Sequence, residues 1–206
     1  MKPSARGMTL LELMATVAIL GVLTSIAVTG YQQMLDNQKR SGAMRSIFTE
    51  AQDAQRQARS LRQPVRLAVR NEVRSGRTVT LLRWERLPCE DAWGATCPTP
   101  ACVTNACGVN GCACSETGLD VELPANLNVT MIDGLCWTGT SAAPVLKDGS
   151  KTCLAAAASP TAGQLAIRYD TALQQVMVVE PLTGVPRMVD CTVAGDAGTA
   201  CLAAGP

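Results

Sequence analysis

The sequence predicts an α+β protein in which a long N-terminal helix packs against a disulfide-rich globular domain. We expect this domain to be an antiparallel β-sheet or β-sandwich. Three observations predict this class: an apolar run near the N-terminus, a helical pattern that continues beyond it, and alternating strand patterns among ten cysteines in the rest of the chain. A chain of 206 residues has room for one globular domain and one long additional element.

The first element is a basic leader followed by an apolar run. Residues 1–7 (MKPSARG) carry Lys2 and Arg6, and residues 8–30 are apolar except for a few small polar residues and Glu12. At about 1.5 Å per helical residue this run spans roughly 35 Å, enough to cross a bilayer. The basic leader should stay cytoplasmic and place the rest of the chain outside the inner membrane. A secretory signal peptide, a plain membrane anchor and a buried core helix are the alternatives.

Glu12 argues against all three alternatives. A carboxylate inside a membrane span costs about 2.5–3.5 kcal/mol on insertion scales, so an acid there generally has a cationic partner. No Lys or Arg occurs between Met8 and Gln38. We therefore expect the partner to come from another chain or from a terminal amine.

Gly7 followed by Met8-Thr9-Leu10-Leu11-Glu12 resembles the prepilin signature of the type IV pilin-like family. The resemblance implies that a prepilin peptidase cuts between Gly7 and Met8 and N-methylates Met8. It also implies that the Glu12 carboxylate pairs with the methylated Met8 amine of a neighbouring subunit and sets the axial register.

Three positions refine the resemblance. Met8 stands where the family usually has Phe, an exchange that the peptidase accepts, and Gly21 matches a glycine of major pilins. Thr29 stands where major pilins commonly have a helix-kinking Pro. This departure favours a minor pilin or pseudopilin over a major pilin.

The helical pattern continues through residues 31–63 with an apolar stripe spaced for an amphipathic helix: Met44, Ile47, Ala51, Ala54, Ala58 and Leu61. Pro64 should end the helix near Arg62. We expect the opposite face, which includes Gln55, Arg56 and Arg59, to be solvated. The segment from Ala51 to Leu67 (AQDAQRQARSLRQPVRL) resembles pseudopilin H and the FimU/FimT-like minor pilins, and in that group two facing antiparallel sheets pack on the helix.

Residues 64–206 are predicted to form a periplasmic β-rich domain with a Cys-rich insert at 86–118. A hairpin is expected from Val65 to Trp84 around the turn Arg74-Ser75-Gly76-Arg77. Further strands are predicted at Leu119–Leu123, Leu127–Ile132, Leu165–Tyr169, Gln174–Glu180 and Val185–Asp190. We expect the Ala/Gly-rich tail from Ala194 to be flexible, restrained at Cys201.

The cysteines indicate disulfides in an oxidising compartment, because the chain has no histidine to share a metal site or activate a thiol. A thiolate metal site is the weaker alternative. The pairing stays open among Cys89, Cys97, Cys102, Cys107, Cys112, Cys114, Cys136, Cys153, Cys191 and Cys201.

These features predict a structural assembly subunit and no enzyme, cofactor or metal centre, since no catalytic constellation containing histidine is possible. The resemblance implies a minor pilin that initiates or caps a type IV pilus. The partners it implies are other minor pilins, the major pilin, prepilin peptidase, the inner-membrane assembly platform and a tip adhesin. The protein would start as a single-pass inner-membrane protein and end in the pilus.

Two alternatives stay open. One is a pseudopilin of a type II secretion system. The other is a DNA-uptake minor pilin that uses Arg56, Arg59, Arg62 and Arg66. The charge distribution is relevant to DNA binding, because residues 39–86 carry a net charge of +8 and residues 87–206 a net charge of −7. This segregation favours contacts between subunits over nucleic-acid binding.

Overall fold

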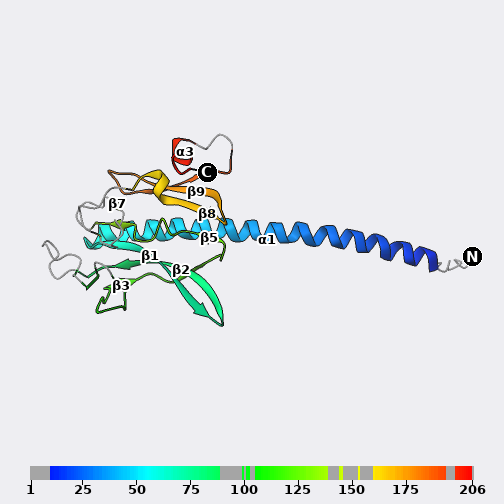
Figure 1. Ribbon diagram of the computed structural model, residues 1–206, viewed down its shortest axis with the longest axis horizontal. Coiled ribbons are helices and arrows are strands. Elements are labelled where there is room, and N and C mark those ends of the chain that lie inside the picture. Colours follow the sequence, from blue (N-terminus) through cyan, green and yellow to red (C-terminus); the bar gives the residue numbers. More distant parts are fainter. Residues whose placement is uncertain are drawn as a thin grey trace, which may run out of the picture. The chain divides into compact units, whose positions relative to one another are not determined.

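A computed structural model describes residues 10–88, 99, 101–102, 105–138, 144–145, 153, 160–193 and 198–205. The described chain is an α+β protein with one long helix and two antiparallel sheets (Figure 1). Residues 1–42 and 43–206 form two separate compact units. Each unit is considered by itself below.

Helix α1 runs from Leu10 to Leu61 without interruption. It ends where the sequence predicts, because Arg62 adopts a left-handed conformation with φ of 53° and Pro64 follows two residues later. In the second unit, Met44, Ile47, Ala51, Ala54 and Ala58 of the predicted stripe are buried. Leu61, the last residue of the stripe, is exposed.

The first sheet is built on the predicted hairpin. Strand β1 (Val65–Arg74) pairs with β2 (Arg77–Arg86) through ten residue pairs, and Ser75 and Gly76 form the two-residue turn. Both turn residues have positive φ. This conformation is typical of two-residue hairpin turns, because its backbone twist matches the twist of the two strands. β2 also pairs with β3 (Glu116–Thr117) and β4 (Val121–Leu123), and β1 pairs with β6 (Cys136–Trp137), which pairs with β7 (Pro144–Val145).

The second sheet has the strand order β10-β9-β8-β5. Its strands are β5 (Leu127–Asn128), β8 (Ala166–Tyr169), β9 (Ala172–Val179) and β10 (Pro186–Asp190), with a short 3-10 helix, η1 (Ala162–Leu165), before β8. The predicted strand Leu127–Ile132 is wrong beyond Asn128, because a turn that includes Ile132 follows. The predicted strand Leu119–Leu123 is shorter than expected and begins at Val121.

One hydrophobic core joins these elements. Helix residues such as Ile47 and Ala51 share a cluster with Leu67 and Trp137 of the first sheet and Ile167 of the second. Figure 1 shows β8 and β9 on one side of the second half of α1, and β1 and β2 on the other. The Trp137 indole Nε1–H donates to the Gly184 carbonyl at 2.8 Å, so the buried ring also ties β6 to the turn between β9 and β10.

The C-terminal segment is ordered where it is described, which makes the expectation of a flexible tail wrong there. Thr199–Ala203 form helix α3, which packs on η1 and β9. A disulfide joins Cys191 to Cys201, and the Arg168 guanidinium donates to the carbonyls of Ala204 and Gly205. The predicted restraint at Cys201 is confirmed, whereas the contact with Arg168 was not predicted, because Arg168 lies in a distant segment of the chain.

Candidate functional site

The first part of α1 exposes apolar side chains around its circumference. Twelve large ones are exposed, at Leu10, Leu11, Leu13, Met14, Val17, Ile19, Leu20, Val22, Leu23, Val28, Tyr31 and Met34. Among the described residues, α1 is the helix long and apolar enough to cross a membrane. A helix that is apolar on all sides needs an apolar surrounding, either lipid or other helices.

Three hydroxyls of this segment bond to the helix backbone. The Thr16 hydroxyl donates to the Leu13 carbonyl, Thr24 to the Leu20 carbonyl and Ser25 to the Val22 carbonyl, at 2.8–2.9 Å. Hydroxyls satisfied within their own helix present little unmet polarity to hydrocarbon. The segment therefore suits lipid although it is not purely apolar.

The structure describes some of the residues that the sequence predicts to act near the N-terminus. Gly7 and Met8 lie outside the described residues. Glu12 lies in the first turn of α1 and is exposed, a position where a negative charge also complements the helix dipole. An ideal Cβ added at Gly21 meets nothing within 4 Å, and the helix continues unbroken through Thr29.

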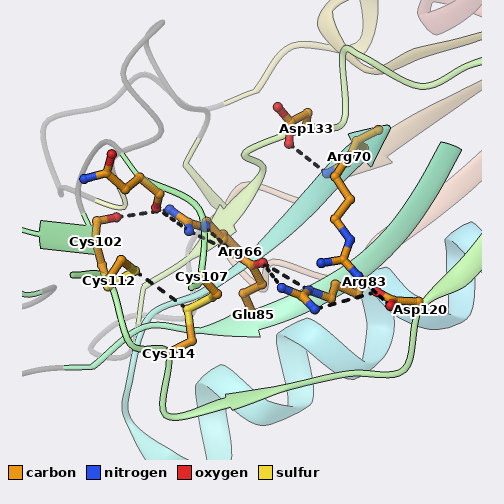
Figure 2. A network of polar contacts seen from close by, with 12 residues as sticks. Arg66, Arg70, Arg83, Glu85, Cys102, Cys107, Cys112, Cys114, Asp120 and Asp133 are labelled. Atoms are coloured by element: carbon orange, nitrogen blue, oxygen red, sulfur yellow. Dashed lines mark hydrogen bonds and ion pairs between the residues drawn. A yellow bond between two sulfur atoms is a disulfide. The ribbon is translucent and has the colours of Figure 1, made fainter. Parts of the chain in front are cut away.

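The second notable region is a buried ionic network on the hairpin β1–β2 (Figure 2). Arg66 and Glu85 are paired residues in the strand register, and each is only 1% exposed. The Arg66 guanidinium donates from Nε and Nη2 to Glu85 Oε2 at 3.0 and 2.8 Å. Arg83 donates from Nε and Nη2 to Glu85 Oε1 at 3.1 and 2.9 Å. Four donated hydrogen bonds thus compensate the buried Glu85 carboxylate.

Arg66 also holds the Cys-rich insert on the sheet. Its Nη1 donates to the Cys102 carbonyl at 3.1 Å and its Nη2 to the Asn105 carbonyl at 2.8 Å. Further along the hairpin, the Arg70 guanidinium donates to the Asp120 carboxylate at 2.5 Å. The Arg83 guanidinium lies 3.7 Å from the same carboxylate, which follows β3 in the chain. The network therefore joins the hairpin to segments on both sides of β3.

Disulfides close the insert over this network. Cys102 is bonded to Cys112 and Cys107 to Cys114, and the sulfurs of Cys112 and Cys114 lie 3.9 Å apart. A third bond joins Cys136 of β6 to Cys153, and Cys191–Cys201 is the fourth. Cys89 and Cys97 lie outside the described residues.

The bonded sulfurs bear on the alternative of a metal site. In the part of the chain that the structure describes, the groups close enough to share an ion are Cys102, Cys112 and Cys114, and Glu85 with Cys107 and Cys114. All four of these cysteines are in disulfides, and a disulfide sulfur has no thiolate charge to offer a metal. In this oxidised form the four cysteines cross-link the insert.

Of the four arginines proposed for DNA binding, Arg56, Arg59 and Arg62 are exposed and Arg66 is buried. Arg66 is buried against Glu85, Arg56 pairs with Asp53 at 3.3 Å, and Arg59 donates to the Thr183 carbonyl. Gln55 is buried and donates to the same carbonyl at 2.8 Å. The expectation that this helix face is solvated is therefore wrong at Gln55, whereas Arg59 is exposed and also bonds to the turn between β9 and β10.

Comparison with known families identifies the N-terminal segment. Residues 2–28 match the family model of the prokaryotic N-terminal methylation motif. This motif indicates a type IV pilin-like prepilin N-terminus. No curated protein and no solved structure matches the chain significantly.

The prepilin N-terminus has direct consequences for the chain. It indicates a structural subunit that is processed by prepilin peptidase and assembles with other pilins. The motif and the apolar start of α1 also fit anchoring in the inner membrane. The matched segment includes Gly7, Met8, Glu12 and Gly21, which are residues of the prepilin resemblance.

Proposed function

We propose that the protein is a minor pilin that initiates or caps a type IV pilus. The observation that carries this proposal is the methylation motif at residues 2–28, continuous with an unbroken 52-residue helix whose second part forms the core of a disulfide-rich domain. The helix would be held by lipid before assembly and by sister helices afterwards. The domain would lie in the periplasm and then at the pilus surface.

The proposed assembly step is an ion pair between subunits. Cleavage after Gly7 makes Met8 the first residue, so Glu12 becomes the fifth residue of the mature chain. A carboxylate at membrane depth costs about 2.5–3.5 kcal/mol, and the methylated Met8 amine of a neighbour would offset that cost. Because the amine belongs to another subunit, the compensation comes with docking and fixes the axial register.

Three features support a minor pilin over a major pilin. Thr29 replaces the proline common in major pilins, and α1 continues through this position. The insert covering Arg66 and Glu85 is stapled by two disulfides, which gives the domain a rigid exposed loop of the kind that recognises partners. The resemblance of Ala51–Leu67 to pseudopilin H and FimU/FimT-like minor pilins points to the same group. Other minor pilins and a tip adhesin are the proposed partners.

Processing is tested with a matched pair of glycine substitutions. Gly7→Ala should leave an uncleaved precursor, whereas Gly21→Ala should be processed normally, since its added methyl meets open space. N-terminal sequencing of the membrane fraction gives the readout. A mature chain that begins anywhere other than Met8 contradicts the cleavage assignment.

Assembly is tested at Glu12. Glu12→Gln should be cleaved and inserted but should be depleted from sheared fibres at least tenfold. The control Asp36→Asn removes a helix carboxylate outside the apolar run and should assemble normally. Wild-type incorporation of Glu12→Gln would refute the ion pair.

The position of the subunit tests the minor-pilin role. Antibody against the domain should label few sites for each fibre, concentrated at the tips. Labelling along whole fibres would indicate a major pilin. Loss of protein secretion without loss of fibres, on deletion of the gene, would instead support a type II secretion pseudopilin.

A further inference from the structure

The triplet Asn128-Val129-Thr130 is the single Asn-x-Ser/Thr sequence in the 206 residues. It has the acceptor pattern for N-linked glycosylation, with a residue other than proline in the middle. Asn128 ends strand β5, an edge strand of the second sheet, and is exposed, as is Thr130. Val129 between them is buried and anchors the triplet in the core.

The geometry of the triplet presents the Asn128 amide for reaction. Its Oδ1 accepts the Thr130 backbone N–H at 3.1 Å and the Thr130 hydroxyl at 2.8 Å. Both bonds engage the oxygen of the amide. Among the hydrogen bonds of the described residues, none uses the Asn128 Nδ2, which is the atom that a glycosyl donor must reach.

A polar hollow lies beside this amide. It has a volume of about 500 Å³ and is lined by Asn128 and Thr130 together with side chains that suit sugar hydroxyls: Asn71, Asn126, Asp133 and Asp170. Ligand sites in proteins are commonly of this size. Val69, Leu127 and Val129 also line the hollow and add apolar surface for a sugar ring.

We propose that Asn128 is an N-glycosylation site whose first sugar lies in this hollow. The proposal rests on the proposed function, because a glycan donor and its transferase would meet this domain only outside the inner membrane. The donor class is an oligosaccharide linked to a lipid diphosphate. Asn128 Nδ2 attacks C1 of the reducing-end sugar, and the N–C1 bond forms as the bond from C1 to the diphosphate oxygen breaks. The lipid diphosphate leaves with the bonding electron pair, and one Nδ2 proton passes to a base of the transferase.

The test expresses the full chain in cells that contain a periplasmic oligosaccharyltransferase requiring only Asn-x-Ser/Thr, together with its lipid-linked donor. Intact mass and peptide mapping of the membrane-extracted protein should show one glycan, at Asn128. Asn128→Gln and Thr130→Ala should lose it. Thr130→Ser keeps the acceptor pattern and should retain it, as should the matched control Asn126→Gln, which changes a neighbouring asparagine outside the pattern.

A secreted reporter carrying Asn-Val-Thr, glycosylated in the same cells, shows that the transferase works. An unmodified Asn128 in chains that begin at Met8 then overturns the glycosylation proposal and leaves the proposed function standing. A glycan at Asn128 on chains cut elsewhere supports the site and contradicts the proposed processing. A glycan retained in Thr130→Ala would overturn the role of this triplet.

Discussion

The substitution Glu85→Gln tests the buried ionic network most directly. Glu85 accepts four hydrogen bonds, two from Arg66 and two from Arg83, and Arg66 is 1% exposed. Glutamine keeps the shape of the side chain and one acceptor oxygen but removes the negative charge. The Arg66 guanidinium then stays buried with only the backbone carbonyls of Cys102 and Asn105 as certain acceptors.

Removing one partner of a buried pair costs about 3–5 kcal/mol, since a buried charge loses its compensation. The oxygen that glutamine retains places the expected loss at the lower end, about 3 kcal/mol. A domain of this size is stable by roughly 5–15 kcal/mol, so a large share of the unfolding free energy would be lost. With a urea dependence of about 1–3 kcal/mol per molar, the unfolding midpoint should fall by roughly 1–3 M.

The assay is urea unfolding of the oxidised fragment 43–206, followed by tryptophan fluorescence. Glu116→Gln is the matched control, because Glu116 pairs with Arg86 at 3.3 Å but is half exposed, and such pairs contribute about 0–1 kcal/mol. If Glu85→Gln shifts the midpoint no more than Glu116→Gln does, the buried pair does not stabilise the domain and the reasoning is wrong.

Three further variants test other parts of the domain. Burial raises the pKa of Glu50, whose Oε2 has no hydrogen-bond partner among the described residues, and nearby Asp53 adds to the rise. The folded state therefore binds the proton more tightly than the unfolded state, so this residue lowers stability as pH rises through its folded pKa. Glu50→Gln should raise Tm at pH 7, and the gain should vanish below about pH 4.3; an equal gain at both pH values would contradict the sign. Replacing Cys191 and Cys201 together by alanine opens a loop with a sequence separation of 10 and should cost about 2.7 kcal/mol in urea unfolding, whereas an unchanged midpoint would show that the tail contributes nothing. Gly118→Ala places a methyl 2.6 Å from the Trp84 ring and should lower Tm by several degrees and change tryptophan fluorescence; wild-type values would show that the ring moves freely.

The sequence predicted those helices, strands and turns whose residue patterns lie within one short segment of the chain. The 3-4 spacing from Met44 to Ala58 identified the buried face of the helix, and Pro64 identified its end. Ser75-Gly76 predicted the hairpin. A two-residue turn at these positions also fixes the strand register, and this register sets Arg66 opposite Glu85. The pairing of these two residues therefore follows from the position of the turn. The burial of this pair could not be predicted, because the sequence does not show that the insert covers this part of the sheet.

The features that sequence reasoning missed depend on contacts between distant segments. Gln55 is buried because the turn at Thr183 folds back on the helix, and Arg168 orders the end of the tail in addition to the restraint predicted at Cys201. The cysteine pairing is of the same kind, since ten cysteines permit many pairings and only the fold selects among them. Cleavage after Gly7 and the pairing of Glu12 with Met8 stay predictions, because they concern a peptidase and a second subunit.

The ionic network and the disulfides depend on each other. Arg66 lies on the hairpin, yet two of its acceptors, the carbonyls of Cys102 and Asn105, belong to the insert. Without the insert, the face of the sheet that carries Arg66 and Glu85 would be open to water, and an exposed pair contributes little. The insert is too short to build a large core of its own, and the bridges Cys102–Cys112 and Cys107–Cys114 hold its shape. Burial of the ion pair and closure of the insert should therefore occur together, after oxidation. For a subunit exported from the reducing cytoplasm, this coupling would delay completion of the insert surface until the domain has left the compartment in which its cysteines are reduced.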